Sequence, residues 1–129
     1  MATWRDVRRI ALALPDTSEG TSFGNTAWKV SGKLFTWERP LRKADLAALG
    51  GAAPKGPILG IRTADLEMKE AVLASDPDVY FTTPHFVGYP AVLIRLGEIS
   101  TKELKDVIAE AWLARAPKRA AEAYLRERK

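Results

Sequence analysis

The chain has 129 residues, of which 47% are hydrophobic and 28% are charged, and its formal net charge is +4. These values are typical of one globular domain with a buried core, and they exclude an intrinsically disordered chain. The absence of cysteine excludes disulfides, zinc fingers, iron–sulfur clusters and thiol catalysis.

The first predicted element is an amphipathic helix that begins after Thr3 and ends at Pro15. Thr3 and Asp6 have the spacing of a capping box, and apolar residues then recur at helical intervals, namely Trp4, Val7, Ile10, Ala11 and Leu14. The stretch 16–25 is rich in Ser, Thr and Gly, so we expect a loop there. Alternating apolar residues then predict two antiparallel strands within 26–39, joined by a turn at 31–33.

The middle of the chain is irregular at first and then returns to a strand pattern. Residues 40–57 contain several Gly and Pro residues, and only 43–49 allows a helical turn. A third strand is predicted at 58–62, followed by a short helix that ends near residue 74. Two further strands are predicted at 79–83 and 91–96, on either side of a loop.

The C-terminal part is predicted to be helical. Ser100 and Glu103 have the spacing of a regular capping box, and the longest helix follows with the apolar stripe Leu104, Val107, Ile108, Ala111 and Trp112. Pro117 interrupts this helix and suits the first turn of a short last helix.

This order of elements predicts the fold class. Hairpins without alternating strand–helix–strand units favour a single α+β domain over 1–129, in which helices from both chain ends pack on one face of a five-stranded antiparallel sheet. We expect its core to include Val7, Ile10, Leu14, Trp28, Phe35, Ile61, Phe81, Val92, Ile94, Leu104, Ile108 and Trp112.

Basic residues are concentrated in two places. Between residues 28 and 43 one acid, Glu38, stands against five basic residues, Lys29, Lys33, Arg39, Arg42 and Lys43, and a second group near the C-terminus contains Lys118 and Arg119. Such clusters either keep a surface solvated or bind phosphate groups. We expect these side chains to be exposed, so that replacing Arg39, Arg42 and Lys43 by Ala leaves the fold intact.

The segment 80–96 contains the single histidine of the chain and four aromatic residues. Its loop has three interpretations. His85 can hydrogen-bond to the backbone of a hairpin tip; Phe86 or Tyr89 can stack on bases while His85 or Arg95 contacts phosphate; or the loop can form part of a small-ligand or protein site.

Motifs for catalysis are absent or occur in the wrong context. Residues 20–24 match G-x-S-x-G, but a nucleophile elbow needs a preceding strand and a following helix, and here we expect a preceding loop and a following strand. His85 alone does not make a transition-metal site. The sequence therefore predicts no catalytic residues, no metal and no cofactor.

Several short motifs, in order, resemble those of the MmcQ/YjbR family. They are Leu14-Pro15, Glu19, the segments 29–35 and 88–96, Trp112 and the segment 116–119. The resemblance implies a compact α+β fold, similar to frataxin-like proteins and secretion chaperones, and a DNA-binding role with two hairpin wings. These wings would be 26–39 and 79–96. The second carries only His85 and Arg95 as basic residues, so it lacks the charge that phosphate binding needs.

Two functional hypotheses follow from this sequence. The first is a non-enzymatic nucleic-acid-binding protein that contacts DNA through the basic hairpin and C-terminal residues. The second is a protein- or small-ligand-binding module with its site near the His85 loop. The chain has no apolar run of ~20 residues and no export signal at its start, so we expect a cytoplasmic protein without a membrane partner. We also expect a monomer.

Overall fold

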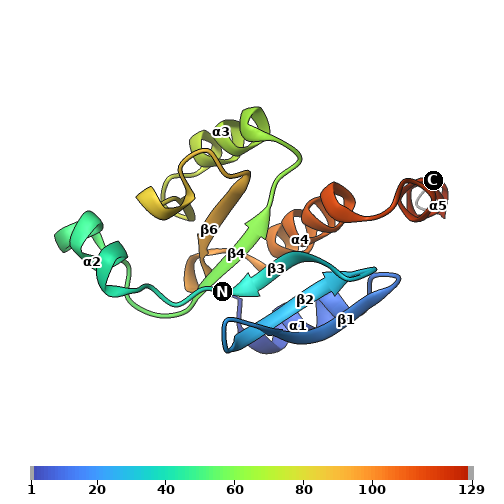
Figure 1. Ribbon diagram of the computed structural model, residues 1–129, viewed down its shortest axis with the longest axis horizontal. Helices are drawn as coiled ribbons and strands as arrows, with labels where there is room; N and C mark the ends of the chain where they lie inside the picture. The colour runs from blue at the N-terminus through green and yellow to red at the C-terminus, as the bar shows by residue number, and fades with distance from the viewer. Residues whose placement is uncertain (1, 128–129) are drawn as a thin grey trace.

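The computed structural model describes residues 2–127, and its centre is one antiparallel sheet (Figure 1). Six strands lie in the order β1-β2-β3-β4-β6-β5. Their bounds are Thr17–Ser22 (β1), Asn25–Val30 (β2), Lys33–Glu38 (β3), Ile58–Arg62 (β4), Tyr80–Phe81 (β5) and Ala91–Arg95 (β6). The helices are Trp4–Leu12 (α1), Lys43–Leu49 (α2), Leu66–Ser75 (α3), Thr101–Arg115 (α4) and Lys118–Glu127 (α5), with short 3-10 turns at Gly50–Ala52 (η1), Pro84–Phe86 (η2) and Leu96–Glu98 (η3).

The prediction of an α+β domain with an antiparallel sheet is confirmed, but the prediction of five strands is wrong. The stretch expected to be a loop contains β1, which pairs along its whole length with β2. Its sequence, TSEGTS, has no apolar alternation, because β1 is an edge strand whose residues are exposed or half-buried. The pairing is therefore made by backbone hydrogen bonds, to which a pattern of hydrophobic residues gives no clue.

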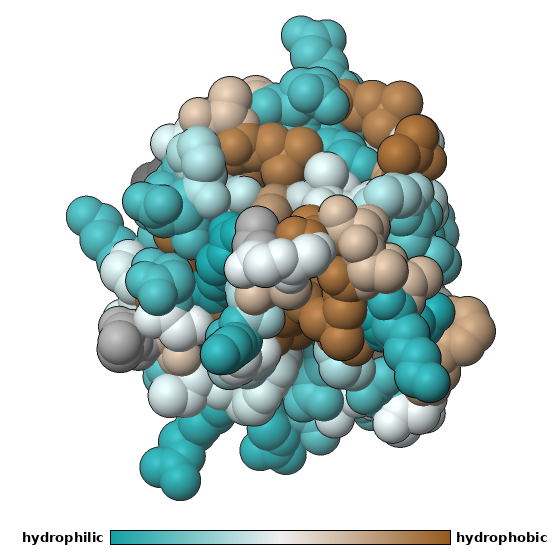
Figure 2. Space-filling view, turned by 90° about the vertical axis from the view of Figure 1, so that its left-hand side faces the viewer, coloured by the Kyte–Doolittle hydropathy of each residue, from teal (hydrophilic) through white to brown (hydrophobic). Residues whose placement is uncertain are grey.

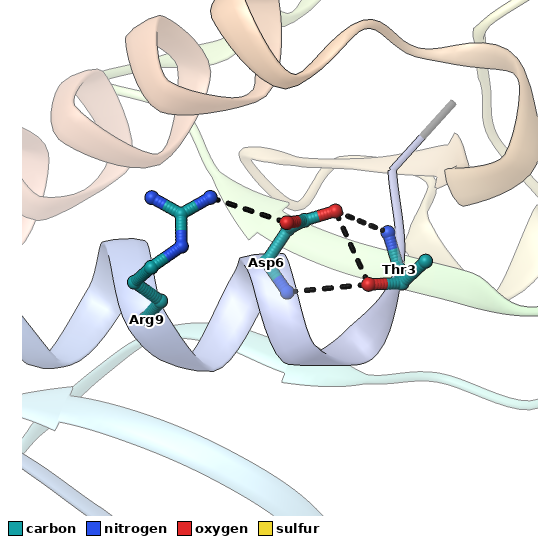
Figure 3. A network of polar contacts seen from close by, with 3 residues as sticks. All are labelled: Thr3, Asp6 and Arg9. Carbon is teal, nitrogen blue, oxygen red and sulfur yellow. Dashed lines mark hydrogen bonds and ion pairs between the residues drawn. The ribbon is translucent and has the colours of Figure 1, made fainter.

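Helix α1 begins as its sequence predicts (Figure 3). The Thr3 backbone N–H donates to Asp6 Oδ2 at 2.9 Å, and the Asp6 N–H donates to Thr3 Oγ1 at 3.4 Å. Arg9 Nη2 adds a contact of 3.1 Å to Asp6 Oδ1. The capping box thus satisfies N–H groups that the first helical turn leaves without partners.

The main core lies between the sheet and helices α1 and α4. Apart from Leu14, which is half-buried, and Phe81, which belongs to a second cluster, every residue of the predicted core is buried in this one. The Trp112 indole N–H donates to the carbonyl oxygen of Pro15 at 2.9 Å and so joins α4 to the end of α1. The Trp28 indole N–H donates to Glu19 Oε1 at 3.1 Å, which accounts for an acid on the exposed strand β1.

A smaller apolar cluster lies on the opposite face of the sheet. Along β6, Val92 and Ile94 belong to the main core, whereas Ala91 and Leu93 belong to the second cluster, as the alternation of a strand requires. Phe86 from η2 and Leu49 from α2 cover this second face. The helices from both chain ends, α1 and α4, pack on one face as predicted, whereas residues 43–49, where the sequence allowed one helical turn, form a helix that packs on the other face.

A register irregularity in the β2–β3 pairing positions Trp37. The pairing shifts between Trp28 and Lys29, so Phe35 lies in the main core while Trp37, two residues later, lies in the second cluster. Simple alternation would place both rings on one face. The bulge therefore places the Trp37 side chain on the face of the sheet that α1 and α4 do not cover.

Helix α5 extends away from the sheet at the end of the molecule opposite α2 (Figure 1). It has no fully buried residue, and its Tyr124 ring lies 5.0 Å from that of Trp112. No helix within residues 2–127 has the length and apolar content needed to cross a membrane.

Candidate functional site

The second face of the sheet carries a pocket of about 280 Å³, which we call the aromatic pocket. Three segments line it: the turn between β1 and β2, strand β3 with the residues after it, and the loop that contains η2. Their lining residues are Ser22, Phe23, Asn25, Leu34, Trp37, Glu38, Arg39, Arg42, His85, Phe86 and Tyr89. Figure 2 shows the side of the molecule that carries α2, where hydrophobic side chains gather near the centre and hydrophilic residues surround them.

The walls of the aromatic pocket are mainly rings. Trp37 is 8% exposed and Phe86 is 7% exposed, whereas Tyr89 is 41% exposed at the rim. The Phe86 ring lies 4.9 Å from the His85 imidazole in an edge-to-face arrangement and 6.3 Å from the Tyr89 ring. Rings held in this way form apolar walls at an angle to one another, and such walls can pack against the face and the edge of a planar group.

A buried ion pair forms the polar end of the aromatic pocket. Arg39 Nη1 lies 3.0 Å from Asp45 Oδ2, and both side chains are almost fully buried. The guanidinium carbon also lies 5.2 Å from the centre of the Phe86 ring, while Nη2 is buried without a hydrogen-bond partner among residues 2–127. A buried donor without an acceptor is rare in native proteins and calls for an explanation.

Asp45 connects this ion pair to α2. Its Oδ2 accepts the Arg42 backbone N–H at 2.9 Å. Burial raises the pKa of Asp45, but the Arg42 N–H and the charge of Arg39 outweigh it, so the pKa lies below its ordinary value. Asp45 is therefore an ionised partner that holds Arg39 in the wall.

Lys69 on α3 holds the loop that carries the aromatic side chains. Its Nζ donates to the carbonyl oxygens of Phe86 and Tyr89, the latter at 2.8 Å. Lys69 is 4% exposed, and burial lowers its pKa although Glu70 opposes the shift. Sequence reasoning missed both Lys69 and Asp45. The Arg42–Asp45 spacing could have indicated a helix cap, but Lys69 has no local signal because its partners are 17 and 20 residues away.

The rim of the aromatic pocket contains an unusual aromatic residue. Phe23 is 91% exposed and has a φ of +51°, next to Gly24 at +83° in the tight turn between β1 and β2. A bulky residue rarely adopts this conformation. Arg42 lies 6.0 Å from the Phe23 ring, and Arg62 lies 4.9 Å from the Tyr89 ring and donates to its hydroxyl.

The structure distributes the predicted basic residues over three regions. Lys29 and Lys33 lie at the β2–β3 turn, whereas Arg39 follows the other end of β3. A strand of six residues is roughly 20 Å long, so Arg39 is far from the turn. Arg42 and Lys43 are exposed at the start of α2. Lys118 and Arg119 begin α5, which lies at the end of the molecule opposite α2 (Figure 1).

Two arginines differ from their expected roles. Arg39 is 5% exposed and paired with Asp45, so the expectation that its side chain is exposed is wrong. Arg95 lies on β6, outside the lining of the aromatic pocket. Its Nη1 donates to the Pro77 carbonyl oxygen at 3.1 Å, and its guanidinium lies 4.6 Å from the Phe81 ring.

The G-x-S-x-G stretch also has a different context from the one predicted. Ser22 ends β1, so a strand precedes the turn, and β2 follows it where a nucleophile elbow would have a helix. Ser22 and the exposed His85 both line the aromatic pocket. Within residues 2–127 no group of three or more His, Cys, Asp and Glu side chains is placed to hold a metal ion.

Comparisons with known proteins identify relatives over nearly the whole chain. Residues 12–114 match the YjbR family. The uncharacterised proteins Mb2600 of Mycobacterium bovis and Rv2570 of Mycobacterium tuberculosis are each 52% identical over 128 residues, which covers 97% of this chain and 97% of theirs. The crystal structure of Deinococcus radiodurans protein DR2400, with the domain DUF419, has a TM-score of 0.67 at 19% identity and covers 98% of this chain and 88% of its own. This last similarity is one of fold.

Proposed function

The chain belongs to the YjbR family, and from the geometry of the aromatic pocket we propose that it is a non-enzymatic binding protein that holds a small, flat ligand there. The observation that carries this proposal is the combination of buried rings with the unsatisfied Nη2 of Arg39 in one concave site. Ligand sites are typically mostly apolar with a few polar groups that fix the orientation of the ligand.

The construction of the walls supports a binding role. Lys69, Asp45 and Arg39 are buried charged groups, and each is fixed by hydrogen bonds or an ion pair to a segment that lines the aromatic pocket. Buried charges are costly unless they are paired, and here their partners fix the segments that line the site. Segments that are fixed before binding lower the entropy cost of binding, even where a side chain such as Phe86 has to turn.

Single-stranded DNA is a second candidate partner, at the rim. Phe23 is almost fully exposed in a strained turn, the exposed Arg42 lies near its ring, and the exposed Lys43 follows Arg42 at the start of α2. An exposed ring beside cations is the usual combination for stacking a base while contacting phosphate. Of the basic residues that the sequence indicated for nucleic-acid binding, this candidate site contains only Arg42 and Lys43.

The proposal can be tested by titrating ¹⁵N-labelled protein with three flat probes of different charge: 2-naphthamide, 2-naphthoate and 2-naphthylmethylammonium. We expect at least one probe to shift backbone amide signals of residues 22–25, 37–39 and 85–89. Signals of α5, at the other end of the molecule, serve as the internal control. If none of the three probes at millimolar concentration shifts the pocket signals, the proposed function is wrong.

A further inference from the structure

Resting on the proposed function, we propose that the ligand of the aromatic pocket is an aromatic monocarboxylate whose carboxylate binds Arg39 and Arg42. Three features of the site support this assignment: the charges that line it, the unsatisfied donor in its wall and the shape of its rings.

The charges that face the aromatic pocket select a ligand with one negative charge. Asp45 compensates Arg39, whereas Arg42 has no ion-pair partner within residues 2–127. Glu38 borders the pocket, but it pairs in register with Leu59, a main-core residue, so its side chain belongs to the opposite face of the sheet. Among the Asp, Glu, Lys and Arg side chains that face the pocket, one positive charge, that of Arg42, therefore remains. A cationic ligand would be repelled, and the second negative charge of a dianion would find no positive charge in the pocket to compensate it.

The unsatisfied guanidinium nitrogen selects an oxygen acceptor. Arg39 Nη1 donates to the Pro40 carbonyl oxygen at 2.6 Å and contacts Asp45, while Nη2 has no acceptor among the described residues. A carboxylate has two acceptor oxygens, so it can bind Nη2 with one and Arg42 with the other. Because the Phe86 ring lies against the Arg39 guanidinium and Nη2 is covered, we expect this ring to turn away from Nη2 as the ligand binds and to pack against the ligand instead.

The rings require that the rest of the ligand is flat and apolar. Trp37 and Phe86 form the deep walls, and the exposed Tyr89 and Phe23 form the rim. An aromatic body stacked on these rings places an attached carboxylate at the arginine end.

The test compares the affinities of 2-naphthoate, 2-naphthamide and 2-naphthyl phosphate by isothermal titration calorimetry. We expect naphthoate to bind about tenfold to a hundredfold more tightly than the uncharged amide, the ratio typical of hydrogen bonds between charged groups. Arg42→Gln should weaken the binding of naphthoate more than that of naphthamide and so remove most of this preference. Lys43→Gln is the matched control, since Lys43 does not line the aromatic pocket.

A second measurement reports on Arg39 without changing it. The ¹⁵N signals of the Arg39 guanidinium should shift with naphthoate and stay in place with naphthamide. Equal affinities for acid and amide, or tighter binding of the phosphate, would overturn the inference about the ligand while the pocket remains a binding site. Binding of none of the three would refute the proposed function as well.

Discussion

The indole of Trp37 occupies the space above Gly60 that any other residue would fill with its side chain. A Cβ atom at position 60 would lie 2.5 Å from Trp37 Cε2, closer than real contacts allow. The two residues are cross-strand partners in β3 and β4, so the glycine lets the indole lie across the sheet and form the wall of the aromatic pocket.

Gly60→Ala should therefore displace Trp37. We expect a loss of about 1 to 3 kcal/mol in the free energy of unfolding, as for other overpacked cores, and weaker naphthoate binding. Gly20→Ala is the matched control, because Gly20 is also in a strand but a Cβ atom added there would have no neighbour within 4 Å. Urea unfolding of both variants measures the difference. Equal stability of the two variants would show that Trp37 does not depend on Gly60.

Asp45→Asn should destabilise the protein and change its response to acid. Removing the carboxylate leaves Arg39 buried without a counter-charge, which typically costs about 3 to 5 kcal/mol. The pKa of Asp45 is lower in the folded than in the unfolded chain, where it is about 3.9. The stabilisation that ionised Asp45 gives to the fold is therefore complete above this pH and is lost as the pH falls through the folded pKa. The stability of the wild type should thus fall more steeply below about pH 4 than that of the variant, measured by urea unfolding at several pH values.

Asp106→Asn, on the exposed surface of α4, controls for the general effect of losing a carboxylate. A wild type and an Asp45→Asn variant with parallel stability curves in acid would contradict the role assigned to this ion pair.

Lys69→Met should loosen the loop that carries Phe86 and Tyr89. Methionine fills a similar volume but cannot donate to the two carbonyl oxygens, which then keep only the backbone N–H groups of Tyr89 and Ala91 as partners. We expect a loss of about 2 kcal/mol or more in stability and faster hydrogen exchange at the amides of Val87 and Tyr89, which bond within this loop. Lys102→Met, on the exposed first turn of α4, is the control. Unchanged exchange at both amides would exclude Lys69 as the residue that holds the loop.

Phe23→Ala tests the second candidate function. If the exposed ring stacks on a base, the variant should bind a short single-stranded oligonucleotide about 1 to 3 kcal/mol more weakly. The salt dependence should stay the same, because the phosphate contacts of Arg42 and Lys43 remain. Leu125→Ala, an exposed apolar residue on α5, is the control in a fluorescence anisotropy titration. Equal affinities of the Phe23 variant and the parent would remove this ring from any nucleic-acid site.

Much of the fold could be predicted because local patterns determine it. The helix caps at Thr3 and Ser100 and the apolar stripe of α4 appear in the structure where the sequence places them. Strand β1 could not be predicted from hydrophobicity, since an exposed polar edge strand has none of the alternation that marks a buried one. The position of Trp37 depends on a bulge in the β2–β3 pairing, which no spacing of residues reveals.

The candidate site was predicted only in part. The aromatic loop around His85 could be identified, because its rings and prolines are close together in the sequence. Its partners come from elsewhere: Phe23 from the first hairpin, Arg39 from the end of β3 and Lys69 from α3. The count of charged residues also gave no sign that Arg39 is buried. It does not distinguish a solvated cation such as Lys43 from a buried one such as Arg39, whose charge Asp45 compensates.

A flat ligand in the aromatic pocket would lie with its rings against Trp37 and Phe86. Intermolecular nuclear Overhauser effects between bound 2-naphthoate and the protein locate the ligand without any substitution. We predict contacts from the naphthalene protons to the side chains of Trp37, Phe86 and Tyr89. Contacts confined to other aromatic residues, such as the neighbouring pair Trp112 and Tyr124, would contradict the proposed site.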